Sequence, residues 1–131
     1  MNYINTRLDN GRLGNMMFQL ASVIGCAKKN NAIPVFPKWR YSKYFKNELK
    51  PTIIIATHHY RESQFHYKAI DLNESMQQSE AEDKVFNLHG YFQSIRYFDN
   101  CEPIIKNQFE PKTEALKEVY HKYSNCIFLH N

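Results

Sequence analysis

The sequence predicts an α/β protein with an open, Rossmann-like sheet and flanking helices. Residues 3–36 read in order as a strand, a glycine-containing loop, an amphipathic helix and a second strand, which is the unit of a parallel sheet. A further strand followed by a helix start lies within 85–98, and the apolar stretch 126–129 is typical of a strand covered on both faces. At 131 residues the chain is long enough for a single domain, spanning 1–131.

The first unit has the clearest pattern. Residues 3–8 are rich in side chains that favour extended backbone, and the two glycines of residues 9–14 then predict a tight loop. From Asn15 to Lys29, apolar residues recur at steps of three and four, which predicts a helix with one buried face. Asn30 and Asn31 are expected to end this helix before a short strand at 32–36.

The remaining elements follow from local start and stop signals. Residues 73–84 are polar and predict an exposed loop, and 85–89 predict a strand. Ser94 is a good helix cap, Pro103 suits the first turn of another helix, and Thr113 is expected to cap a helix that runs to about residue 123. The chain ends two residues after the final predicted strand, so we expect a fold that is truncated at its C-terminus.

Composition excludes several classes of protein. Leu, Ile, Val and Phe make up 32 of 131 residues, which is enough apolar surface to exclude intrinsic disorder. We expect no transmembrane segment, because the apolar runs are only a few residues long. The N-terminus lacks the features of a secretory signal, so we expect a cytoplasmic protein that can also lie peripherally at a membrane surface. Three cysteines without close spacing argue against a disulfide framework. The net charge of +4 is too small to predict a nucleic-acid partner.

Ligands of open α/β sheets bind beyond the carboxyl ends of the strands, so the loops that follow the strands are the candidate sites. The loop at 11–15 places two glycines, a cation and an amide at a helix N-terminus, where an anion is favoured. It lacks the third glycine of a dinucleotide fingerprint and the Gly-Lys-Ser/Thr of a phosphate loop, so neither NAD nor ATP chemistry is predicted. From the residues alone, an ordinary strand-to-helix turn is an equally good interpretation. His89 and Gly90 occupy the matching position after a later strand.

Three sequence blocks resemble those of the α-1,2-fucosyltransferase family, glycosyltransferase family 11. Residues 11–21 read Gly-Arg-Leu-Gly-Asn-Met-Met-Phe-Gln-Leu-Ala, similar to the family's Gly-x-Leu-Gly-Asn-Gln-Met-Phe-Gln-Tyr-Ala, with Met16 in place of glutamine. Residues 90–98 read Gly-Tyr-Phe-Gln-Ser-x-x-Tyr-Phe and residues 60–67 read Tyr-x-Glu-x-x-Phe-x-Tyr, and both resemble family segments. The resemblance spans residues 3–130, with the blocks in the family's order and spacing.

The resemblance implies transfer of L-fucose from GDP-fucose to the 2-hydroxyl of a β-galactoside, with inversion and with neither a metal nor another cofactor. It also implies that this chain is the N-terminal, acceptor-side domain of a two-domain, GT-B-like enzyme. Family members follow the histidine that matches His130 with Arg-Arg-Gly-Asp and a nucleotide-sugar-binding domain, so a separate chain carrying that half is an expected partner. Asn15 and Arg12 are the implied catalytic residues, and the implied substrate-binding residues are Gly11, Gly14, His89, Gly90, Tyr91, Gln93 and His130.

Other interpretations remain open. A protein that keeps only the acceptor-side half could bind a glycan without catalysis. The basic and aromatic stretch at 38–50 could instead bind single-stranded nucleic acid by stacking and phosphate contacts. His58, Glu62 and His66 are spaced to share one helix face as metal ligands, although an exposed or acceptor-side cluster is the preferred interpretation. Arg96 is expected to pack against an aromatic ring or to pair with an acid.

Overall fold

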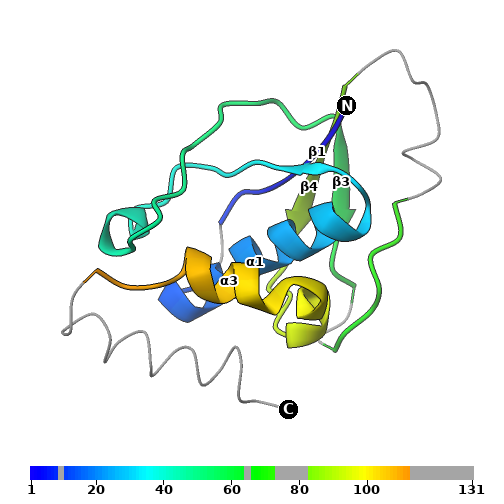
Figure 1. The fold of residues 1–131 in the computed structure, drawn as a ribbon. Helices are drawn as coiled ribbons and strands as arrows, with labels where there is room; N and C mark the ends of the chain where they lie inside the picture. The colour runs from blue at the N-terminus through cyan, green and yellow to red at the C-terminus, as the bar shows by residue number, and fades with distance from the viewer. Residues whose placement is uncertain (9–10, 64–65, 73–82, 113–131) are drawn as a thin grey trace.

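The computed structural model describes residues 1–8, 11–63, 66–72 and 83–112. Its centre is a four-stranded parallel sheet with the strand order β2-β1-β4-β3 (Figure 1). The strands are β1 (Asn2–Thr6), β2 (Ile33–Pro34), β3 (His58–Arg61) and β4 (Lys84–His89). The predicted α/β class is therefore confirmed, and the architecture is compatible with a Rossmann-like fold.

Helix α1 (Leu13–Lys29) connects β1 to β2 and begins two residues before the predicted start. At its other end, Asn31 takes a left-handed conformation with φ 53°, and the backbone N–H of Ala32 donates to the carbonyl of Ala27 at 2.8 Å. This pattern is a Schellman motif, in which a left-handed residue satisfies carbonyl groups of the last helical turn. The predicted helix end at Asn30 and Asn31 is confirmed.

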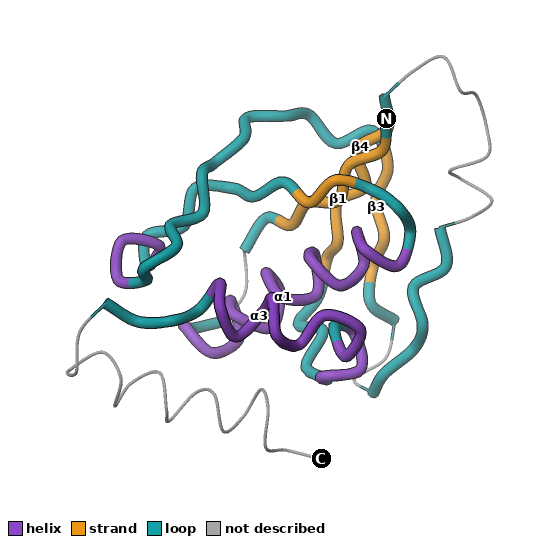
Figure 2. Tube along the Cα trace, in the orientation of Figure 1, coloured by secondary structure: helices purple, strands orange, loops and turns teal. Residues whose placement is uncertain are grey.

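Two 3-10 turns that follow β4 pack against α1 (Figure 2), and a short helix packs against the second of these turns. They are the short 3-10 turns η2 (Ile95–Tyr97) and η3 (Asp99–Cys101) and the helix α3 (Glu102–Gln108). The predicted start signals are confirmed, because the Ser94 hydroxyl accepts from the backbone N–H of Arg96 and Pro103 lies in the first turn of α3. The helix predicted from Thr113, the strand predicted at 126–129 and most of the loop predicted at 73–84 lie outside the described residues.

The two faces of the sheet differ in character. Side chains alternate along a strand, so Ile4 shares one face with its register neighbours Phe86 and His58. Ile4 and Phe86 are fully buried in the core, which α1 also joins. The opposite face carries the next row of side chains, which are polar. We call this second face the polar face; it holds a row made by Asn5, Asn87 and His59.

Strand β3 was not predicted. It pairs in parallel with β4 along residues 58–61, so the idea that His58, Glu62 and His66 share a helix face is wrong. Neither face of β3 is apolar, because its side chains are polar or half-buried. The hydropathy pattern of this segment therefore does not predict a strand. Its extended backbone comes from pairing with β4, and the backbone N–H of Val85 also donates to the hydroxyl of Thr57, just before β3, at 2.9 Å.

A long connection between β2 and β3 includes the 3-10 turn η1 (Ser42–Tyr44) and an aromatic cluster. Trp39 and Phe45 stack with ring centroids 5.4 Å apart, and Phe109 meets both rings edge-on. All three rings are buried. Two of the aromatic side chains that single-stranded nucleic acid would need for stacking therefore belong to the core. Within the described segments, no helix is long and apolar enough to cross a bilayer.

Candidate functional site

The loops that follow β1 and β4 meet at the carboxyl ends of these strands. The side-chain Nε2 of Gln93, in the loop after β4, donates a hydrogen bond to Oδ1 of Asn15, in the first turn of α1. The two residues are 78 positions apart in the sequence. The structure thus brings together two of the predicted site residues at the edge of the sheet where open α/β proteins bind ligands.

Gly11 allows the Asn15 side chain to lie close to the loop backbone. Gly11 has φ +83°, and a Cβ atom at this position would lie 2.8 Å from Cγ of Asn15. A larger residue would both strain the backbone and displace the amide. Arg12 follows as the N-cap residue of α1, and its exposed side chain makes no capping hydrogen bond. Leu13, Gly14 and Asn15 form the first turn, where backbone N–H groups have no partner within the helix.

Glu62 holds the loop that carries Gln93. Its Oε1 accepts from the backbone N–H of Tyr91 at 3.1 Å, and its Oε2 accepts from that of Phe92 at 3.2 Å. Gly90, with φ +146°, lies so close that a Cβ atom there would stand 2.5 Å from Cβ of Glu62. Glu62 is therefore a positioning residue of this loop. Sequence reasoning noted it as a possible metal ligand and as part of a family block, but did not predict that role.

The other predicted site residues lie in different surroundings. Nε2 of His89 is 2.7 Å from Nδ1 of His59, so the His89 side chain extends along the polar face toward β3. Tyr91 is partly exposed, with its backbone N–H bound by Glu62. Arg96 stacks on the ring of Tyr67 at 4.1 Å from its centroid, which is the expected packing role. His130 lies outside the described residues.

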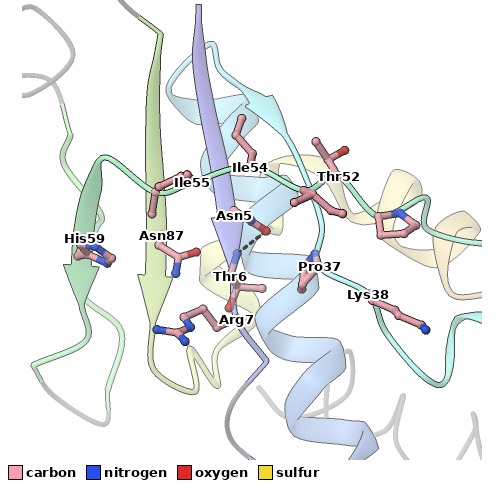
Figure 3. A pocket seen from close by; sticks show the side chains of 13 residues that line it. Asn5, Thr6, Arg7, Pro37, Lys38, Thr52, Ile54, Ile55, His59 and Asn87 are labelled. Atoms are coloured by element: carbon pink, nitrogen blue, oxygen red, sulfur yellow. Dashed lines mark hydrogen bonds between the residues drawn. The ribbon is translucent and has the colours of Figure 1, made fainter.

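A concavity of about 700 Å³ opens on the polar face (Figure 3). We call it the sheet-face pocket. Asn5, Asn87 and His59 form its floor, Arg7 and Lys38 lie at its lower edge in Figure 3, and residues 51–56 run across it. Sequence reasoning did not predict this pocket. The alternation of side chains along β1 and β4 could have indicated the pocket, because it places Asn5, Arg7 and Asn87 on one face of the sheet.

Asn87 is the most unusual residue of the sheet-face pocket. It is only 4% exposed, and among the described residues its side-chain amide has no hydrogen-bond partner. A buried amide without a partner lowers stability by about 1–3 kcal/mol. Such a group points to a functional constraint.

The structure is that of an open α/β protein with two candidate ligand sites. One is formed by the loops at the strand ends, and the other is the sheet-face pocket. Comparisons of the chain with protein-family models, with curated proteins and with solved structures give no match. The resemblance to α-1,2-fucosyltransferases therefore stays a prediction from the sequence blocks.

Proposed function

We propose that this chain is the acceptor-side half of a galactoside α-1,2-fucosyltransferase. The observation that supports the proposal best is the hydrogen bond between Asn15 and Gln93. It joins the block at 11–21 to the block at 90–98, the two longest segments that resemble the family. Their contact lies at the strand ends, where a shared substrate site is expected for this class of sheet.

The proposed reaction is a displacement at the anomeric carbon of fucose. The 2-hydroxyl oxygen of the galactoside attacks this carbon, and the bond from the carbon to the diphosphate breaks. GDP leaves with the bonding electron pair, and the hydroxyl proton passes to a base. Negative charge grows on the departing diphosphate, so a cation and oriented N–H groups stabilise the transition state. Arg12 and the first backbone N–H groups of α1 are suited to this role.

The paired amides are suited to bind sugar hydroxyls. Because Gln93 donates through Nε2 to Oδ1 of Asn15, the complementary atoms, Nδ2 of Asn15 and Oε1 of Gln93, can serve a ligand. One sugar hydroxyl can accept a hydrogen bond from Nδ2 of Asn15, and another can donate a hydrogen bond to Oε1 of Gln93. Met16 follows where the family has glutamine, and its sulfur accepts from the indole Nε1 of Trp39 at 3.4 Å. This position contributes packing in place of a polar contact.

The proposal assigns the nucleotide part of GDP-fucose to a second domain. The acceptor-side half would then supply the galactoside site and one wall of the cleft. Such a division leaves Asn15, Arg12 and Gln93 facing the reacting sugar.

Fucose transfer tests the proposal. Because the nucleotide part is assigned to a second domain, the purified chain is combined with the nucleotide-sugar-binding domain of an enzyme of this family, and the mixture is incubated with GDP-fucose and lactose. We expect a product that carries fucose on the galactose 2-hydroxyl, detected by mass spectrometry and NMR. Asn15→Ala is expected to lower the rate at least tenfold, because it removes both the ligand-facing Nδ2 and the partner of Gln93. Asn47→Ala is the matched control, since Asn47 bonds the carbonyl of Asn107 on another part of the surface.

Two results would count against this function. Lactose binding without turnover, even at high enzyme concentration, would favour a glycan-binding protein without catalysis. Absence of both turnover and lactose binding would contradict the proposal altogether.

A further inference from the structure

We propose that the sheet-face pocket binds a small acidic sugar, that is, a hydroxyl-bearing ring that carries one carboxylate or phosphate. This inference goes beyond fucose transfer and does not rest on it. None of the described residues that line the pocket belongs to the residue set assigned to the transfer reaction.

The floor of the pocket offers hydrogen bonds in a fixed row. Asn5, Asn87 and His59 are register neighbours on three adjacent parallel strands, so their side chains stand side by side. Oδ1 of Asn5 accepts from the backbone N–H of Thr6 at 2.8 Å, which orients its Nδ2 as a donor. The buried Asn87 amide supplies one further donor group and one acceptor. Vicinal hydroxyls, which both donate and accept, match this row.

The charge of the pocket selects for an anion. Arg7 and Lys38 line it, and none of the described lining residues is acidic. Figure 3 shows Arg7 extending from β1 toward β4, below Asn87. A guanidinium binds the two oxygens of a carboxylate or phosphate in a fork geometry. An oxyanion attached to the ring is therefore expected at this end of the row.

One part of the pocket lining is apolar. Residues 51–56 include Ile53, Ile54 and Ile55, which line the pocket, and Figure 3 shows Ile54 and Ile55 on the segment that crosses β1 and β4. A sugar ring has hydroxyl edges and an apolar C–H face, so it can satisfy the amides and pack on the isoleucines together. The volume of about 700 Å³ lies within the range of small-molecule sites, which are about 300–1,000 Å³.

Four probes separate the parts of this proposal. Glucuronate and glucose 6-phosphate carry the ring with a carboxylate or with a phosphate, glucose has the ring alone, and inorganic phosphate has the anion alone. Affinities for the full chain are measured by calorimetry and by NMR titration. We expect one of the two acidic sugars to bind at least tenfold more tightly than both glucose and inorganic phosphate, and the better of the two identifies the oxyanion.

Variants then locate the site. Asn87→Leu keeps the side-chain size while it removes the buried amide, so we expect a fold at least as stable as the wild type but an acidic-sugar Kd raised at least tenfold. Arg7→Gln is expected to raise the Kd for the acidic sugar at least tenfold and to leave the weak glucose affinity unchanged. Arg40→Gln is the matched control, because Arg40 is exposed and contacts the ring of Tyr41 outside the pocket.

The proposal is overturned if neither acidic sugar binds at millimolar concentration or if both bind no better than inorganic phosphate. It is also overturned if Asn87→Leu and Arg7→Gln change the Kd no more than Arg40→Gln does. A well-dispersed NMR spectrum of each variant checks that a loss of binding does not come from unfolding. Fucose transfer is not measured here, so failure of this proposal and failure of the proposed function are distinguishable.

Discussion

Gly25→Ala is expected to lower the free energy of unfolding by about 2–3 kcal/mol. Gly25 lies in α1 where η2 and the start of η3 approach most closely, and a Cβ atom there would overlap the carbonyl oxygen of Tyr97 and lie 2.7 Å from Cα of Phe98. These are backbone atoms, so no side-chain rotation relieves the overlap. Helix propensity acts in the opposite direction, since alanine favours a helix interior by about 1 kcal/mol over glycine.

Urea unfolding followed by circular dichroism gives the sign of the Gly25→Ala effect. Lys28→Ala, at an exposed position of the same helix, should stay within about 0.5 kcal/mol of the wild type. A Gly25→Ala chain that is more stable than the wild type would mean that propensity outweighs packing and that α1 is not held against residues 97–98.

Stability is expected to fall steeply between pH 9 and pH 12. Burial raises the pKa of the Cys26 thiol from 9.0 to about 12, although the hydrogen bond from Asn30 and the charge of Lys29 act in the other direction. A thiol whose pKa is higher in the folded chain stabilises the fold below pH 9, and this contribution is lost as the pH rises through the folded value. The loss amounts to about 1.4 kcal/mol per pH unit in this window, or about 4 kcal/mol in total.

The pH effect is checked by denaturant unfolding at pH 7, 9, 10 and 11. Cys26→Ala should be less stable at pH 7, because it leaves a small cavity, and its stability should fall less steeply above pH 9. Burial also raises the pKa values of Cys101, Tyr60 and Tyr97, so part of the alkaline loss remains in that variant. Equal slopes for the variant and the wild type would contradict the assignment to Cys26.

Elements with a strong local pattern could be predicted from the sequence. The three- and four-residue spacing of apolar side chains predicts the helix α1. The expectation of a single buried face is wrong, because η2 and η3 also pack on the helix and the polar side chains Gln19 and Ser22 are buried as well. Strand β3, with the sequence His-His-Tyr-Arg, could not be found in this way. It is an edge strand whose conformation depends on pairing with β4, and such tertiary pairing leaves no local signal.

The candidate sites also differ in how far the sequence alone could predict them. Asn15 was predicted as a site residue from its loop after a strand and from the family resemblance, and Gln93 from the resemblance alone; the structure places the two residues in contact. Asn5 and Arg7 were not among the predicted site residues. Alternation along β1 places them instead on the polar face, and their register with Asn87 and His59 depends on a strand order that no single segment encodes.

The central claim is that the loops at 11–15 and 90–93 form one site for the galactoside acceptor. A double-mutant cycle on Asn15→Ala and Gln93→Ala, with the affinity for lactose measured by NMR titration, tests it most directly. We expect each single variant to weaken binding about tenfold and the double variant to weaken it by clearly less than the product, because residues in contact act as a unit. Lactose affinity that is immeasurable in the wild type, or unchanged in both single variants, would contradict the claim.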